Sequence, residues 1–138
     1  MRSRILALLC CVLSFSLACN RTAPPKEGET AKPTVALVLK TLNSPFFIEM
    51  RKGAVDAAAK EGIDLVIQAA EREVDVEKQM QIIENLIQTR IEVLLITPSG
   101  SREIVSALVQ ASAARVPIVV VDTRLDSKAA ADAHLRWE

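Results

Sequence analysis

From residue 34 onward, short apolar runs alternate with longer stretches of mixed polarity. Four runs are almost continuously apolar, as in strands that are buried on both faces of a parallel sheet, and they cover 35–39, 65–67, 93–96 and 118–121. The stretches between them carry apolar residues at the spacing of one helix face. The order βαβαβαβ predicts an α/β fold, a doubly wound parallel sheet with helices on both faces, because crossovers between parallel strands are almost always right-handed.

Local signals place the ends of the predicted helices. The first helix is predicted to start at Pro45, because the N–H of a first helical residue has no intrahelical partner and its absence there breaks no hydrogen bond. It is predicted to end near Gly62, since glycine is common at helix C-termini. The predicted N-caps are Ser44 for the first helix, Asp75 for the second, and Ser99 or Ser101 for the third. The predicted buried stripes are Val76, Met80, Ile83 and Ile87 in the second helix, and Ile104, Leu108 and Ala111 in the third.

The first 19 residues resemble an export signal. Arg2 and Arg4 precede an apolar run of about 14 residues, which is shorter than the roughly 20 residues that span a bilayer. Residues 16–19, Ser-Leu-Ala-Cys, resemble the lipobox of bacterial lipoproteins, which implies lipid attachment at Cys19 after cleavage. Leu is commoner than Ser three positions before that cysteine, and an ordinary secretory signal with an incidental Cys is the alternative.

A tether is expected between this signal and the domain. Residues 20–33 contain three prolines among small and charged residues, a composition that cannot bury itself. Cys10 and Cys11 leave with the signal, so the mature chain keeps only Cys19 and forms no intramolecular disulfide. We therefore expect a lipid-anchored protein on the periplasmic or cell-surface side of a bacterial membrane.

The chain divides into four predicted parts. They are a lipoprotein signal peptide (1–19), a Pro-rich tether (20–33), a partial α/β lobe (34–127) and a tail (128–138). The lobe holds about half of the elements that a doubly wound fold usually contains. We therefore expect a truncated chain, a fragment of a longer protein.

Charge and composition argue against several classes of function. The chain has 17 basic and 17 acidic side chains, whereas nucleic-acid binding needs clustered, uncompensated Lys and Arg. The single histidine, His134, lies near the end, so a Ser-His-Asp triad and most zinc sites are not expected. An aspartyl-phosphate site at Asp122 is disfavoured because the loop after the first strand offers Lys40 in place of further magnesium-binding carboxylates. We expect no enzyme activity, no metal and no cofactor.

Ligands of open parallel sheets bind outside the carboxyl ends of the strands. Four loops meet there, at 40–44, 69–74, 97–101 and 122–126. The first has no Gly, so dinucleotide-binding and phosphate-loop motifs are absent. The third has a Gly and opens a helix, which suits either an anion or plain capping.

Two adjacent aromatic residues start the first helix beside these loops. Phe47 continues the predicted buried stripe of Met50 and Ala54, and Phe46 lies about 100° away on the helix, so one ring can be core while the other is left over. An exposed ring with a few polar groups suits a sugar, which has C–H faces and hydroxyl edges. The candidate polar groups are Asn43, Ser44, Asp122 and Arg124.

Residues 38–47, which contain Asn-Ser-Pro-Phe-Phe, resemble the opening of the ribose-type periplasmic sugar-binding proteins of ABC importers. Residues 96–99 and 117–122 match the same family in order and spacing, and the resemblance covers about 33–126. It implies two lobes that close on a sugar around a hinge. It also implies that Phe46 and Phe47 sandwich the sugar and that the Asp and Arg of the fourth loop bind its hydroxyls.

Three positions depart from that family pattern. Lys40 stands where a small hydroxyl residue is common, and Ser44 stands where Asn is common. The arginine that usually adjoins the aspartate is here Arg124, with Thr123 between it and Asp122. The polar contacts to the sugar are therefore expected to differ from those of the ribose-binding members of that family.

The resulting expectation is a substrate-binding lipoprotein of an ABC importer. It would bind a monosaccharide or similar small polyol between two lobes, the second of which is missing here, and its partners would be the sugar, the ABC permease subunits and a membrane through the N-terminal lipid. One alternative is a ligand-sensing domain that passes sugar occupancy to a membrane sensor or signalling partner. Another, an exported α/β enzyme, has no visible nucleophile or metal set.

Overall fold

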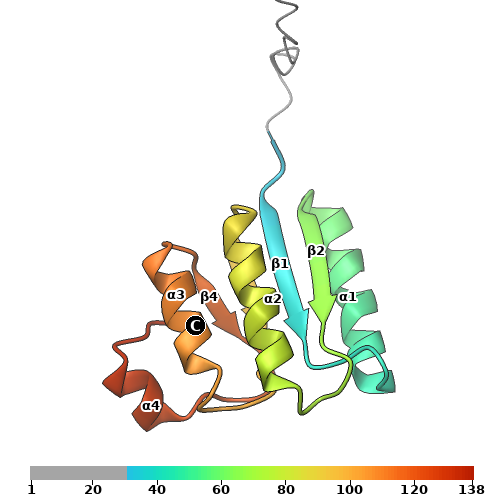
Figure 1. Ribbon diagram of the computed structural model, residues 1–138. Coiled ribbons are helices and arrows are strands. Elements are labelled where there is room, and N and C mark those ends of the chain that lie inside the picture. Colours follow the sequence, from blue (N-terminus) through green and yellow to red (C-terminus); the bar gives the residue numbers. More distant parts are fainter. Residues whose placement is uncertain (1–30) are drawn as a thin grey trace, which may run out of the picture. The chain divides into compact units, whose positions relative to one another are not determined.

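The computed structural model describes residues 31–138, which form a parallel sheet flanked by helices (Figure 1). In chain order the elements are β1 (Thr34–Leu39), α1 (Pro45–Glu61), β2 (Asp64–Ala69), α2 (Val76–Gln88), β3 (Val93–Ile96), α3 (Val105–Ala113), β4 (Ile118–Val120) and α4 (Ser127–Asp132). The predicted signal, Cys19 and most of the predicted tether lie outside the described residues. Among residues 31–138, no helix combines the length and apolar character that crossing a bilayer requires.

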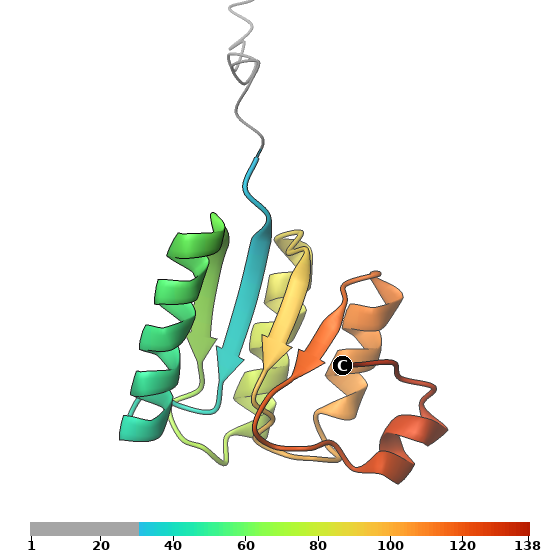
Figure 2. The ribbon, with the colours of Figure 1, turned by 180° about the vertical axis from the view of Figure 1, so that it is seen from behind.

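The strand order is β2-β1-β3-β4, and all three neighbouring pairs are parallel. Leu37 of β1 pairs with Ile67 of β2 on one side and Leu95 of β3 on the other. Helices α2 and α3 lie on one face of the sheet, and α1 lies on the other, which is turned to the front in Figure 2. The predicted doubly wound α/β fold is therefore confirmed.

Alternate residues of the central strand β1 supply two hydrophobic cores. Ala36 and Val38 face α2 and α3, whereas Leu37 and Leu39 pack with Phe47 of α1. Complete burial of such a Leu or Phe side chain contributes about 1.5–3 kcal/mol. The predicted stripe of the third helix is confirmed as buried: Leu108 and Ala111 of α3 and Ile104, which immediately precedes α3, are all fully buried.

Helix α1 begins and ends where the sequence predicts. Ser44 has the extended backbone of an N-cap (φ −107°, ψ 133°), although its side chain makes no capping hydrogen bond, and Pro45 is the first helical residue. Gly62 ends the helix in the left-handed conformation (φ 69°), and its N–H donates to the Ala58 carbonyl. The geometry needs glycine here because a Cβ disfavours this region.

The predicted start of α3 at Ser99 or Ser101 is wrong, because the helix begins at Val105. A helix from Ser101 would need its carbonyl oxygen to accept from the Val105 N–H. That oxygen instead accepts from the Asp126 N–H (2.9 Å), and the Val105 N–H donates to Arg102 in a tighter turn. A contact from the distant fourth loop therefore delays the helix.

Residues 128–138, predicted as a tail, pack against the sheet. Asp126 caps α4, its Oδ1 accepting from the Ala129 N–H at 2.7 Å, and Leu135 is buried in the core. The Glu138 N–H donates to the Ile118 carbonyl, and the Glu138 carbonyl accepts from the Val120 N–H. This pattern pairs Glu138 with β4 as a parallel neighbour.

Candidate functional site

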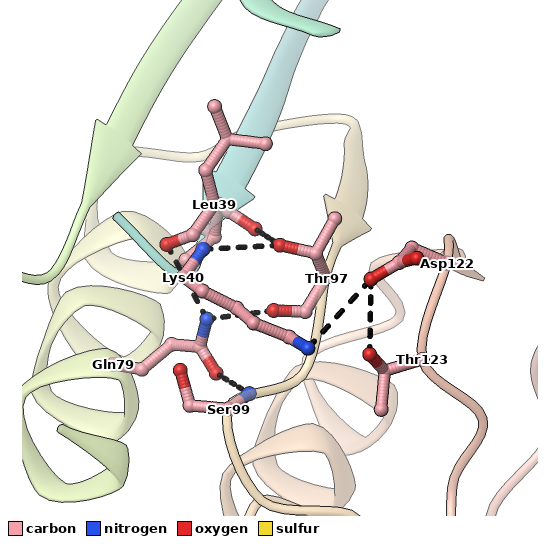
Figure 3. Close-up of polar contacts among 8 residues, drawn as sticks. Leu39, Lys40, Gln79, Thr97, Ser99, Asp122 and Thr123 are labelled. Carbon is pink, nitrogen blue, oxygen red and sulfur yellow. Dashed lines mark hydrogen bonds and ion pairs between the residues drawn. The ribbon is translucent and has the colours of Figure 1, made fainter. Parts of the chain in front are cut away.

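The carboxyl ends of all four strands lie at one edge of the sheet, as predicted (Figure 2). The four loops that leave this edge carry the predicted site residues. The close-up in Figure 3 shows the part of the edge where the loops after β1, β3 and β4 meet.

The Lys40 ammonium reaches across the end of β3 to the Asp122 carboxylate. Nζ of Lys40 lies 3.6 Å from Oδ2 of Asp122, and the two side chains are 17% and 34% exposed (Figure 3). Charge-assisted N–H···O bonds are shorter, about 2.7–2.9 Å, so each group keeps capacity for a further partner. Nζ also lies 5.9 Å from the Phe47 ring centroid. The edge therefore holds a donor and an acceptor of opposite charge beside an aromatic ring.

The backbone at Asp122 has an uncommon conformation. Its φ is +65°, in the left-handed region, and the Thr123 N–H donates to the Val121 carbonyl at 2.8 Å. A hydrogen bond from the N–H of residue i+2 to the carbonyl of residue i, around a central residue with positive φ, forms a γ-turn of the rare, strained class. Asp tolerates a positive φ better than most residues do. Thr123 Oγ1 also donates to Asp122 Oδ2 at 3.0 Å, so the strained turn and this hydroxyl both fix the carboxylate.

Asn43 holds the first loop to the second. Asn43 Nδ2 donates to the Glu71 carbonyl at 2.8 Å, and Thr41 Oγ1 donates to the same oxygen at 2.9 Å. The Asn43 N–H in turn donates to Thr41 Oγ1. The bond to Glu71 engages one N–H of the Asn43 amide, so its second N–H and its amide oxygen keep capacity for a ligand.

The two aromatic rings differ sharply in exposure. Phe46 is 56% exposed, whereas Phe47 is 3% exposed and packs in the core with Leu37 and Leu39. The rings meet edge to face, with centroids 5.1 Å apart. The inference that one ring is core and the other left over is therefore confirmed. A sugar contact by both rings stays a prediction, since Phe47 presents little surface.

The remaining predicted ligand residues are not drawn into this cluster. Arg124 is exposed, and it makes no ion pair within residues 31–138. Ser44 is half-buried at the helix start. The structure thus joins Lys40, Asp122 and Phe47, and it leaves the roles of Ser44 and Arg124 as predictions.

Two further charged groups flank the edge at helix starts. The Ala129 N–H and, after it, the Arg102 guanidinium hold the pKa of the Asp126 carboxyl below its usual range. The Arg72 guanidinium does the same to the pKa of Asp75, the N-cap of α2. Both carboxylates are thus hydrogen-bonded to neighbouring groups of the protein. In the described part of the chain, His, Cys, Asp and Glu side chains form no group of three that could hold a metal ion.

Two residues of this edge were not predicted as site residues. From the sequence, Lys40 is a departure from a family pattern and an argument against an aspartyl-phosphate site, but not a predicted ligand contact, and its carboxylate partner follows a strand that is distant in the sequence. Gln79 of α2 is completely buried and contacts the loops after β1 and β3. Its signal in the sequence is a polar residue on the same helix face as Ile82, Ile83 and Leu86, which follow it by three, four and seven positions.

Comparison with known proteins agrees with the fold. The ribose import binding protein of Bacillus subtilis is 37% identical over 99 residues, which are 72% of this chain and 32% of that protein. The D-allose-binding periplasmic protein of Escherichia coli is 32% identical over 91 residues, 66% of this chain and 29% of that protein. The chain thus spans about a third of the length of the curated relatives it matches.

Solved structures give the same result. A periplasmic solute-binding protein of an ABC transporter from Actinobacillus succinogenes, with bound D-allose, superposes with a TM-score of 0.75 at 39% identity. The match covers 78% of this chain and 37% of that one. The sequence profile of the periplasmic binding protein domain matches residues 35–135. This chain therefore belongs to the periplasmic binding protein family.

Proposed function

We propose that the chain carries part of the sugar-binding surface of a substrate-binding protein of an ABC importer. The observation that carries the proposal is the exposed Phe46 ring, which shares its edge of the sheet with the Lys40–Asp122 pair. The names of relatives that bind ribose or D-allose support a monosaccharide as the ligand. The chain acts by binding, without catalysis, and it presents its loaded state to the permease subunits of the importer.

The charge of the edge suits an uncharged polyol. Asp122 can accept hydrogen bonds from sugar hydroxyls, and Lys40 can donate to them, while the two charges still compensate each other at 3.6 Å. Apolar C–H faces of the sugar would cover the exposed Phe46 ring, and the removal of this apolar surface from water would favour binding. Asn43, Ser44, Phe47 and Arg124 complete the proposed ligand set.

Sugar titrations of this chain followed by NMR test the proposal. D-allose and D-ribose should shift the amide signals of Lys40, Phe46 and Asp122, whereas L-ribose, which has the same bulk properties, should not. Shifts spread evenly over the chain, or equal shifts with both enantiomers, would contradict a specific site. We expect weak binding, because one lobe supplies only part of a cleft. A micromolar dissociation constant, about 8 kcal/mol, would contradict that expectation.

The same proposal places a lipid on Cys19 and the protein at the outer side of a bacterial membrane. Cys19 lies outside the described residues, so this part rests on the lipobox-like sequence before it. In a bacterial host fed an alkyne-tagged fatty acid, the full chain should incorporate the label and Cys19→Ala should not. Equal labelling of both proteins would refute lipid attachment at this residue.

A further inference from the structure

Gln79 is a completely buried polar side chain in the first turns of α2, and all its polar atoms are used. Its Nε2 donates to the Thr97 carbonyl at 2.9 Å and, more weakly, to the Leu39 carbonyl at 3.4 Å. Its Oε1 accepts from the Ser99 N–H at 2.8 Å (Figure 3). One side chain of a helix thus joins the ends of two strands and one loop.

These hydrogen bonds begin where the regular ladder between β1 and β3 ends. The last backbone bond of that ladder runs from the Thr97 N–H to the Val38 carbonyl, at 2.9 Å. Beyond it, the Lys40 N–H donates to a side chain, Thr97 Oγ1, at 3.1 Å. Gln79 and the Thr97 hydroxyl therefore replace the ladder over the last residues before the loops. Buried carbonyls without such partners are strongly disfavoured.

The network ends at the residue that supplies the ammonium of the proposed site. Lys40 follows Leu39, whose carbonyl Gln79 contacts, and the Lys40 N–H is held by the same Thr97 whose carbonyl Gln79 binds. The Lys40 side chain extends from there toward Asp122, and its Nζ lies 3.6 Å from Asp122 Oδ2 (Figure 3). A movement of the β1 end relative to β3 would therefore change the Lys40–Asp122 geometry directly.

We infer that Gln79 is a positioning residue of the binding site: it fixes Lys40 opposite Asp122 without touching the ligand. That Lys40 contacts a sugar rests on the proposed function. That Gln79 holds the backbone at Lys40 rests on the hydrogen bonds alone. It distinguishes Gln79 from an ordinary core residue, because an apolar side chain of equal length would fill the space but would leave two strand ends and a loop unjoined.

The test compares Gln79→Met, which keeps length and removes the hydrogen bonds, with Gln81→Met, an exposed position on the same helix. Gln79→Glu, measured at a pH where its carboxyl is ionised, is the second variant, because the carboxylate keeps an acceptor for the Ser99 N–H and has no donor for the two carbonyls. The readouts are amide hydrogen exchange of the full chain and NMR titration with D-allose. Exchange at Ile83, in the core, reports global opening and serves as the internal reference.

We expect Gln79→Met to speed exchange at Lys40 and Ser99 at least tenfold more than at Ile83, and to weaken the D-allose response about fivefold. Gln79→Glu should keep Ser99 protected while Lys40 exchange rises and the sugar response weakens. Exchange at Lys40 and a sugar response both equal to those of Gln81→Met would overturn the inference. If the unmodified chain shows no sugar response, the proposed function fails instead, and exchange at Lys40 still decides whether Gln79 positions the edge.

Discussion

The adjacent residues Phe46 and Phe47 should respond in opposite ways to truncation. Phe46 keeps 56% of its surface exposed, so less than half of the burial energy of a phenylalanine is at stake, about 1 kcal/mol. Phe47 is 3% exposed, and a buried Phe→Ala change costs about 3–5 kcal/mol. We therefore expect Phe46→Ala to unfold nearly as wild type does, and Phe47→Ala to lose a large part of the stability of a small domain.

Urea unfolding followed by circular dichroism measures the first half of this prediction, and D-allose titration by NMR measures the second. Phe46→Ala should weaken the sugar response strongly at nearly unchanged stability. Val55→Ala is the matched control, because Val55 is also exposed, at 47%, on the same helix. A sugar response of Phe46→Ala equal to that of Val55→Ala would refute a ligand role for this ring. A loss of about 3 kcal/mol in Phe46→Ala would instead show that the ring is part of the core.

Three further predictions concern backbone conformation in α1, backbone conformation at Asp122 and the charge of Asp126. Gly62→Ala should destabilise the chain by about 1–2 kcal/mol, because φ is +69° there. Gly53→Ala, whose added Cβ meets nothing within 4 Å, should instead stabilise the helix by about 0.5–1 kcal/mol. Urea midpoints of the two variants that move in the same direction would contradict this prediction. Asp122→Ala should be less stable than Asp122→Gly by about 1–2 kcal/mol, because only glycine adopts a φ of +65° freely, and both should lose the D-allose response; equal urea stability would argue against strain. Asp126 contributes stability that is complete above the ordinary carboxyl pKa of 3.8 and is lost as pH falls through the lower pKa of the folded state. The difference in unfolding free energy between wild type and Asp126→Ala should therefore be constant above pH 3.8 and shrink below it. A difference that grows on acidification would contradict a lowered pKa of Asp126.

Periodicity and end signals in the sequence predict most of the fold because they are local. The apolar runs predict all four strands to within two residues at each end, and Ser44, Pro45 and Gly62 predict both ends of α1. The start of α3 was not predictable in the same way. It depends on a hydrogen bond between Ser101 and Asp126, which are 25 positions apart in the sequence, and no local pattern encodes that contact.

The site shows the same division between local and distant information. Helix geometry alone separates Phe46 from Phe47, since their positions about 100° apart depend on nothing outside α1. The Lys40–Asp122 pair depends on the order of β1, β3 and β4, because the Lys40 side chain must cross the end of the strand between them. A sequence motif can place both residues at the same edge of the sheet, but it does not state that they meet.

Gln79 lies between these two cases and gives the departure at Lys40 a structural meaning. Its burial follows from local spacing, because Ile82, Ile83 and Leu86 lie three, four and seven residues after it on one helix face, and these are the other buried residues of α2. A buried amide must find partners, and those of Gln79 are the carbonyls at the ends of β1 and β3 and the Ser99 N–H of the loop that follows β3. Lys40 begins at one of those ends, so a lysine in place of a small hydroxyl residue changes what the loop presents to a ligand, while the hydrogen bonds beneath it hold the backbone that carries it.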